Sequence, residues 1–260
     1  MQCEIREVLL WNSIMKTVQE IIPKTMIHFT KDTIELRDTD STHTALLHVH
    51  LKKHIFSSYK IRTDVSIGID IENMVKILKF VKPPMCLQMN YTESTGDHIS
   101  LLVFKDDTCR KRQYSLPLYN LNTLDSKIIS LPIKLRFTIA SKDFYDLCSH
   151  LLLFGDSCSI TINSKTQKVT MTTTGDIGTA EIEFSNSDDT TAVLKFEDKS
   201  AKTFTQSFSL DKWKQFSQAY SISDEVCLCF SDESPLLVHY KIKNDVGDIK
   251  FYLAPKIEDL

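Results

Sequence analysis

The side chains that most often carry out chemistry in proteins occur in this sequence, but their spacing assembles no reactive site. The seven cysteines form no Cys-x-x-Cys pair, and their odd number favours free thiols that act as small hydrophobic residues. His48 and His50 would share one strand face near His43, yet no cysteine or carboxylate at ligand spacing completes a metal site. P-loop, nucleophile-elbow and zinc-protease motifs do not occur, and the carboxylates form no recognisable acid/base pair. We therefore expect no enzyme activity, no metal and no cofactor.

Lysine and arginine offer a different chemistry, the sequence-independent binding of phosphate. Lys76 and Lys79 lie one turn apart in a segment with helical spacing, so they share its polar face. Lys16 lies on the polar side of an earlier segment of this kind, and residues 110–112 form a basic run. Because the net charge is −3, such cations must gather on one surface if they are to bind a polyanion.

Short helices and strands must position these cations. Four segments carry apolar residues at steps of three and four, the pattern of a helix with one buried stripe. These segments are 12–22, 70–80, 141–153 and 211–220. Asp70, Ser141 and Ser209 precede three of them as candidate N-caps. Most of the remaining chain alternates polar with apolar residues, which predicts half-buried antiparallel strands and an α+β fold class.

The order of these elements repeats after about 130–140 residues, which indicates a duplicated domain rather than a solenoid. We expect an N-terminal domain over 1–112, a polar linker with two prolines over 113–134, and a C-terminal domain over 135–260. No apolar run approaches the roughly 20 residues of a membrane span. The N-terminus is too charged for a signal peptide, so the expected compartment is the cytosol or the nucleus.

The C-terminal stretch is the most distinctive part of the sequence. Pro235–Ile242 leads to Phe251-Tyr-Leu-Ala-Pro-Lys-Ile-Glu-Asp259, which closely resembles the end of the proliferating cell nuclear antigen (PCNA) family of DNA sliding clamps. Residues 40–43, 59–79 and 144–156 resemble the same family in the same order. The resemblance spans essentially the whole chain and is weaker in the linker and the second half. It implies two similar clamp domains per subunit, each with two helices on antiparallel sheets, and three subunits in a six-domain ring.

The resemblance implies that basic residues on the helices and beside the linker face DNA. The matching positions are Lys16, Lys24, Lys76, Lys79, Arg110 and Lys214. The second half departs from this pattern, because it carries other residues where relatives carry basic ones. These are Asp146, Ser149, Leu153, Asp211 and Gln218. We therefore expect a weaker and less uniform positive lining there.

The resemblance also implies a pocket beneath the linker, into which partner proteins insert a short apolar motif. The matching positions are Thr39, His43, Leu46, Ile129, Leu131, Pro132, Pro235, Tyr252, Ala254, Pro255, Lys256 and Ile257. At the position of Thr39 the family more often has methionine. The resemblance therefore does not predict which partner motif this pocket prefers. Lys165 lies near a loop lysine that accepts a modification in relatives.

Ring closure, as the resemblance implies it, pairs one strand edge around 109–117 with another around 177–183. The interface candidates are Cys109, Tyr114, Leu151, Phe154, Ile177, Glu181 and Glu183. Leu151 and Phe154 fit ordinary core positions equally well.

The implied function is a homotrimeric ring that encircles duplex DNA in the nucleus, as a processivity factor for DNA polymerases. Its partners would be DNA polymerases, a clamp-loader ATPase, nucleases and a ligase, with no membrane and no small-molecule substrate. A subunit of a heterotrimeric checkpoint clamp is the first alternative. A DNA-modifying enzyme on a clamp-like scaffold is the second, and no catalytic constellation supports it.

Overall fold

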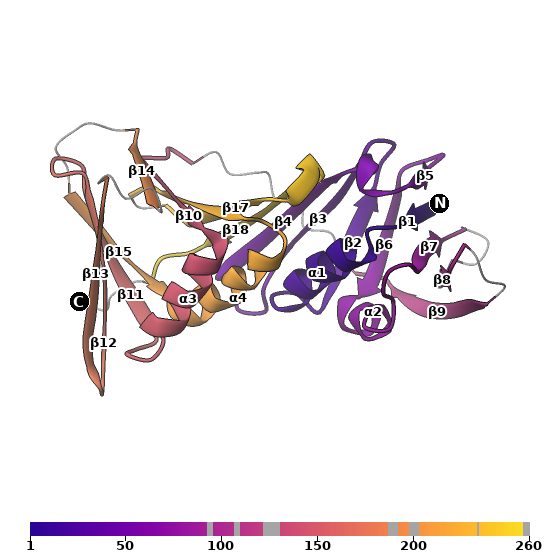
Figure 1. Cartoon of the computed structure of the whole chain (residues 1–260), viewed down its shortest axis with the longest axis horizontal. Helices are drawn as coiled ribbons and strands as arrows, with labels where there is room; N and C mark the ends of the chain where they lie inside the picture. Colours follow the sequence, from indigo (N-terminus) through magenta and orange to yellow (C-terminus); the bar gives the residue numbers. More distant parts are fainter. Residues whose placement is uncertain are drawn as a thin grey trace. The chain divides into compact units, whose positions relative to one another are not determined.

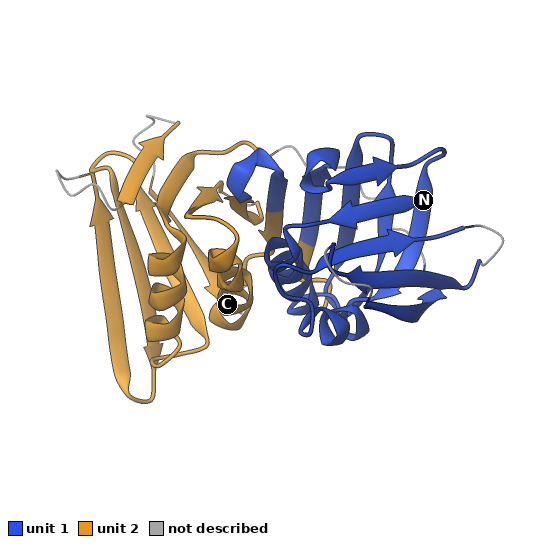
Figure 2. Cartoon of the chain, turned by 45° about the vertical axis from the view of Figure 1, so that its right-hand side comes forward, with its two compact units in different colours: residues 1–41, 47–126, 242–249 blue, residues 42–46, 127–241, 250–260 orange. Residues whose placement is uncertain are grey.

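A computed structural model describes residues 1–92, 96–106, 110–121, 131–186, 192–197, 203–232 and 234–256 of the chain. The chain divides into two compact units, coloured separately in Figure 2. Unit 1 comprises Met1–Ser41, Leu47–Ser126 and Ile242–Ile249, and unit 2 comprises Thr42–Leu46, Lys127–Lys241 and Lys250–Leu260. Two strands, β4 (Ala45–Lys52) and β18 (Gly247–Leu253), are therefore each divided between the units.

Unit 1 consists of two helices and a sheet in the order β4-β3-β2-β6-β9-β8-β7-β1-β5. Its helices are α1 (Val8–Gln19) and α2 (Ile71–Leu78), which pack against each other (Figure 1). Its further strands are β1 (Gln2–Ile5), β2 (Lys24–Phe29), β3 (Thr33–Thr39), β5 (Ser58–Lys60), β6 (Val65–Asp70), β7 (Cys86–Asn90), β8 (His98–Phe104) and β9 (Lys111–Tyr119). Short 3-10 turns cover Lys53–Ile55 and Lys243–Asp245.

The apolar stripes of the helices form the core of unit 1. Trp11, Ile14 and Val18 of α1 are at most 1% exposed, and Met74 and Leu78 of α2 are equally buried. Burial alternates along β2 and β8, so one face of each strand packs into this core. The polar faces of both helices are thereby left for solvent, which is the condition that a cation-bearing surface needs.

Unit 2 consists of two helices and two sheets. Its helices are α3 (Ser141–Leu151) and α4 (Leu210–Ser217), and the latter continues as a 3-10 turn over Gln218–Ser221. One sheet has the order β14-β10-β16-β17-β18 and the other β13-β12-β11-β15. The strands are β10 (Leu135–Ala140), β11 (Ser157–Asn163), β12 (Lys168–Gly175), β13 (Gly178–Ser185), β14 (Ala192–Phe196), β15 (Thr203–Ser209), β16 (Glu225–Phe230) and β17 (Leu236–Lys241).

Aromatic side chains fill the core of unit 2. Trp213 of α4 lies 5.6 Å from Phe144 of α3 between ring centroids, and all atoms of both side chains are buried. Phe216 stacks on Phe251 of β18 at 4.6 Å. These contacts hold α3 and α4 together and against the sheets, as burial of aromatic surface does generally.

The α+β fold class and all four expected helices are confirmed. The expected cap at Asp70 is also confirmed, because its Oδ1 accepts a hydrogen bond from the Asn73 backbone N at 2.9 Å. The cap expected at Ser141 is wrong, because Ala140 is the N-cap residue of α3, whereas Ser209 does occupy the N-cap position of α4. Ser141 is the first residue of α3 with a buried side chain, and Ser209 precedes α4 without a side-chain cap bond.

The segment expected as a linker begins within a strand, because β9 extends to Tyr119. The polar residues at the start of this segment belong to β9, which has one edge without a partner strand in the described structure. Gly68 of β6 permits the close approach of β9, since an added Cβ would collide with the Tyr119 carbonyl oxygen. In the described part of the chain, no helix has the length and apolar character needed to cross a membrane.

Candidate functional site

The polar face of α1 and α2 carries the first group of expected DNA-binding residues. Lys16, Lys76 and Lys79 are exposed on the sides of these helices that face away from the core. Lys24, at the start of β2, is also exposed, and its Nζ lies 4.6 Å from the centre of the Tyr119 ring. Unit 1 therefore brings four of the expected cations to helix faces and to the adjoining strand end.

Carboxylates partly neutralise this surface. Lys76 Nζ lies 2.7 Å from Glu72 Oε1, one helical turn earlier, and this hydrogen bond raises the pKa of Lys76 while it lowers that of Glu72. Lys24 Nζ lies 3.8 Å from Asp70 Oδ2. Lys79 follows the last residue of α2 and makes no ion pair within the described part of the chain. Two of these four cations therefore already have a carboxylate partner, which reduces the attraction they offer to a polyanion.

Lys214, the expected cation of α4, is engaged within unit 2. Its Nζ donates a hydrogen bond to Ser149 Oγ of α3 and lies 3.1 Å from the centre of the Tyr145 ring. Its side chain is only partly exposed. The ammonium group is therefore held between the two helices, and the expected role of Lys214 in DNA binding stays a prediction.

The face of α3 and α4 carries a cluster of aromatic and basic side chains that the sequence did not indicate. Tyr145 and Tyr220 lie 4.7 Å apart between ring centroids, and Lys142 Nζ lies 4.6 Å from the Tyr145 ring centre. Lys142 also pairs with Asp146 at 2.8 Å. The ammonium groups of Lys142 and Lys214 make contacts within unit 2, to Asp146 and to the Tyr145 ring. This face therefore offers less positive charge to a ligand than its number of lysines suggests.

Two of the open strand edges in the described structure, one in each unit, belong to β9 and β13. β9 pairs with β8 along Lys111–Pro117 and with β6 at Leu118 and Tyr119, which leaves the other side of Lys111–Pro117 without a partner strand among the described residues. β13 is the end strand of its sheet and pairs with β12 alone in the described chain. Both edges coincide with the segments expected to join subunits.

The expected interface residues differ in their availability. Tyr114 is partly exposed on β9, Ile177 is 68% exposed just before β13, and Glu181 and Glu183 are exposed on β13. Phe154 is partly exposed. Leu151 is fully buried within unit 2, so the core interpretation is the correct one for this residue. Cys109 lies outside the described residues, and Arg110, exposed, begins the basic run that enters β9.

Most of the residues expected to form the partner pocket lie in several segments of unit 2. The Ala254 backbone N donates to the Thr44 carbonyl at 2.9 Å, so the tail runs beside the segment that holds His43 and Leu46. His43 has a φ of 56°, and its side chain is exposed. The Lys256 backbone N donates to the Ser207 carbonyl at 2.7 Å, which fixes the tail against β15.

The other pocket candidates fall on three further segments. Pro132 accepts a hydrogen bond at its carbonyl from Ser231 Oγ at 2.8 Å, and Leu131 beside it is partly exposed. Pro235 is partly exposed and precedes β17, while Thr39 ends β3 in unit 1. In the tail, Tyr252 is 8% exposed, whereas Ala254 and Pro255 are more accessible. Ile129 and Ile257 lie outside the described residues.

Lys165 is exposed in the turn between β11 and β12. The backbone N atoms of Lys165 and Thr166 donate to Asn163 Oδ1 at 3.1 and 3.0 Å, which holds the turn and leaves the lysine side chain in solvent. Its position suits a modification acceptor, and that role stays a prediction.

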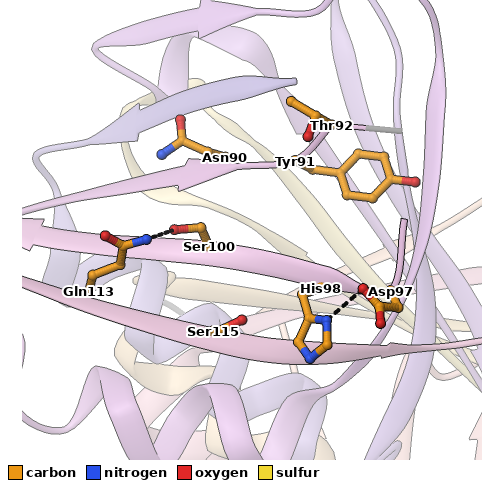
Figure 3. Close-up of a pocket in the computed structure, with 8 residues that line it drawn as sticks. All are labelled: Asn90, Tyr91, Thr92, Asp97, His98, Ser100, Gln113 and Ser115. Atoms are coloured by element: carbon orange, nitrogen blue, oxygen red, sulfur yellow. Dashed lines mark hydrogen bonds and ion pairs between the residues drawn. The ribbon is translucent and has the colours of Figure 1, made fainter. Parts of the chain in front are cut away.

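A pocket of about 490 Å³ lies over β7, β8 and β9 in unit 1 (Figure 3). Its lining residues are Asn90, Tyr91, Thr92, Asp97, His98, Ser100, Gln113 and Ser115. His98 Nδ1 lies 2.7 Å from Asp97 Oδ1, an interaction that lowers the pKa of Asp97, and Gln113 donates to Ser100 at 3.3 Å. Sequence spacing gave no signal for this pocket, because strand pairing brings its residues together. Its hydroxyls and amides offer hydrogen bonds and no activated nucleophile.

Comparison with known proteins places the whole chain within one family. The model of the proliferating cell nuclear antigen N-terminal domain matches residues 1–127, and that of the C-terminal domain matches residues 132–256. Proliferating cell nuclear antigen 2 of Drosophila melanogaster is 28% identical over 259 residues, covering 100% of this chain and 98% of the relative. The Caenorhabditis elegans protein of this family is 28% identical over 96% of this chain and 94% of its own length. That of Chaetomium thermophilum is 24% identical over 100% and 99% respectively.

Proposed function

Because the chain belongs to the proliferating cell nuclear antigen family of DNA sliding clamps, we propose that three identical copies close head to tail around duplex DNA. Topology then holds the DNA, and attraction to phosphate needs to be only strong enough to centre it. In this role the ring is a processivity factor for DNA polymerases in the nucleus, and it has no catalytic activity of its own.

The observation that carries this proposal is the pair of unlike open edges, β9 in unit 1 and β13 in unit 2. An open edge exposes unpaired N–H and C=O groups that favour pairing with another chain. Pairing of two unlike edges between identical subunits is a heterologous contact, which closes a ring when the rotation fits. Tyr114 and Ile177 offer apolar surface at these two edges.

The helix faces support passage along DNA rather than attachment at one site. Lys16 of α1, Lys76 of α2 and Lys79 directly after α2 are exposed, and Arg110 is exposed before β9. Since Lys76 is already paired with Glu72, the attraction per subunit is modest. Such diffuse attraction allows sliding, because neutralising phosphates is insensitive to sequence.

We further propose that the tail and the segments beside it dock partner proteins through a short motif with apolar anchors. The pairing of Ala254 with Thr44 and the exposure of Ala254 and Pro255 support this placement. The partners of this class are DNA polymerases, a clamp-loader ATPase, nucleases and a ligase. One-turn helical motifs with two or three buried anchors suit such a surface.

The molecular mass of the purified chain in solution tests the ring directly. We expect a trimer by sedimentation equilibrium at micromolar concentration, and monomers for Tyr114→Ala because an apolar contact at the β9 edge is lost. Tyr220→Ala serves as the control, since Tyr220 is an exposed tyrosine of the α4 region and belongs to neither edge strand.

The remaining outcomes separate the alternatives. A stable monomer of the unaltered chain would contradict the proposal. A trimer that forms only after a different subunit is added would identify a heterotrimeric checkpoint clamp, and turnover on nicked duplex by the purified chain would identify an enzyme.

A further inference from the structure

Two cysteines of β16 face each other on the side of the sheet that points away from the helices. Val226, Leu228 and Phe230 are fully buried, and Cys227 and Cys229 alternate with them and so lie on the opposite face. The two Sγ atoms are 3.6 Å apart. This separation is within hydrogen-bond reach for sulfur, so one thiol can donate to the other.

The neighbouring strands surround this pair with polar and charged groups. Cys229 lies opposite Arg136 of β10, and Cys227 lies between Thr138 of β10 and His239 of β17. Arg136 Nη1 is 3.5 Å from Cys229 Sγ, and Arg136 Nε is 3.2 Å from Glu197 Oε1. Beyond β10, Lys195 of β14 lies opposite Arg136 and pairs with the same glutamate at 3.0 Å. The guanidinium group therefore places a positive charge beside both sulfurs.

This setting favours a thiolate at Cys227. The pKa of Cys227 is lowered to about 6, chiefly by the hydrogen bond from Cys229, with smaller contributions from Thr138, Arg136 and His239 and against the opposing effect of burial. The same pairing raises the pKa of Cys229, because a second negative charge beside the first is unfavourable.

The other described cysteines lack this environment. Cys3, Cys148 and Cys158 are fully buried, and desolvation raises the pKa of each thiol. Among the six cysteines in the described part of the chain, Cys227 is the one whose side chain is not buried. Reactive cysteines combine accessibility with a positive neighbour, which Cys227 does.

We propose that Cys227 and Cys229 form a dithiol that hydroperoxides oxidise reversibly to an intrastrand disulfide. The Cys227 thiolate attacks one peroxide oxygen, the O–O bond breaks, and hydroxide leaves, so that sulfur becomes a sulfenic acid and peroxide is reduced by two electrons. Cys229 sulfur then attacks Cys227 sulfur, the S–O bond breaks, and the departing hydroxide takes the Cys229 proton as water. Two thiols and one hydrogen peroxide become one disulfide and two water molecules.

The geometry makes this disulfide easy to reduce again. The two sulfurs must approach from 3.6 Å to about 2.05 Å. Alternate residues of a strand have Cα atoms about 6.6–6.8 Å apart, at the upper end of the range that a disulfide spans. Strained disulfides have the more oxidising potentials, so a small dithiol reductant restores the reduced pair.

Peptide mass spectrometry of the full chain after hydrogen peroxide treatment tests this inference. Free thiols are alkylated before tryptic cleavage, which releases 215–241 with Cys227 and Cys229 as its only cysteines. We expect this peptide to lose two hydrogen atoms and to escape alkylation, and dithiothreitol to reverse both changes. At pH 7 Cys227 should react with iodoacetamide about two- to threefold faster than in the urea-unfolded chain, because its larger thiolate fraction outweighs its lower nucleophilicity.

Matched variants separate the two steps. Cys229→Ser should stop at the sulfenic acid, which adds one oxygen to the peptide and is captured by dimedone. Cys227→Ser should leave Cys229 unoxidised, and Arg136→Gln should slow the reaction severalfold. Cys158→Ser, which removes a buried thiol, should change nothing at 215–241.

Circular dichroism and the sedimentation mass establish that each variant is folded, and the milder Arg136→Lys should stay close to the unaltered rate. The inference is overturned if the folded protein keeps Cys227 and Cys229 reduced at a concentration of hydrogen peroxide that oxidises the free amino acid cysteine. It is also overturned if Cys227→Ser is oxidised as fast as the unaltered chain.

Discussion

At the scale of single residues, Lys76 of α2 and Lys79 directly after α2 differ in how much charge they offer to DNA. Lys76 lies 2.7 Å from Glu72, and both side chains are at least half exposed. Lys79 follows the helix and is exposed without an ion pair in the described structure. Binding of a phosphate by Lys76 must displace Glu72, whereas Lys79 binds without such competition.

We therefore expect Lys79→Ala to weaken DNA binding more than Lys76→Ala, and Glu72→Gln to strengthen it. Each phosphate contact that is lost lowers the slope of log affinity against log salt by about 1. Fluorescence anisotropy of a short duplex over a range of salt concentrations measures both quantities. Equal effects of the two lysine variants, with none for Glu72→Gln, would show that the ion pair does not limit Lys76.

Leu151 and Leu153 differ in burial although they are two residues apart. Leu151 is fully buried, and Leu153 is 67% exposed. Leu151→Ala should lower the free energy of unfolding by about 2–5 kcal/mol because it leaves a cavity. Leu153→Ala should change it by about 0.5 kcal/mol or less. Urea denaturation at a fixed protomer concentration makes the comparison, and a subunit contact at Leu151 would instead appear as dissociation of a still folded chain.

At the scale of secondary-structure elements, the two helix pairs present different surfaces. α1 and α2 carry exposed lysines, whereas α3 and α4 hold Lys142 and Lys214 against Tyr145. A cation held over an aromatic ring keeps its charge but loses the freedom to follow a moving phosphate. The weaker positive character expected for the second half therefore has a second cause besides the missing basic residues.

The beginning of α2 is fixed by a side-chain cap that α1, α3 and α4 lack. Asp70 Oδ1 accepts from the Asn73 backbone N at 2.9 Å, whereas the other three helices have no side-chain cap bond. Asp70→Ala should lower the free energy of unfolding by about 1 kcal/mol, since a helix N–H is left without its partner. Glu72→Ala, in the first turn of the same helix, should cost less. Denaturation at one protomer concentration compares them, and equal losses would argue against the cap.

At the scale of the whole molecule, the proposed docking surface combines segments far apart in sequence. The tail pairs with the segment around Thr44, and the Pro132 carbonyl is tied to Ser231. An apolar motif that binds there would contact residues contributed by several strands and connections. Loss of its anchors should therefore weaken partner binding without affecting the edges that close the ring.

We expect replacement of Ile129 and Leu131 together by alanine to weaken binding of a partner-motif peptide at least roughly tenfold, because buried apolar anchors dominate such contacts. Isothermal titration calorimetry gives the affinity, and sedimentation checks that the trimer persists. Leu153→Ala is the control, as an exposed leucine that is not among the expected pocket residues. Unchanged affinity in the double variant would place the pocket elsewhere.

The sequence by itself determined the helices, the fold class and the family. Apolar residues at steps of three and four give a helix its buried stripe, and this signal is local, so all four segments were identified. The Asp70 cap is local for the same reason. The tail from Phe251 onward carried the family resemblance, and the matches to both domain models confirm it.

Only the tertiary structure decided which lysines, cysteines and strand edges are available for binding or reaction. Lys214 is tied to Ser149, 65 positions away, and Arg136 lies beside Cys229, 93 positions away. The exposed edge of β9 depends equally on where β6 and β8 pair with it. Such contacts follow from which strands and helices become neighbours, and periodicity along the chain carries no information about that choice. The pairing of strands and the packing of helices therefore decide which lysines are held by other side chains, which cysteines lie together and which strand edges stay open.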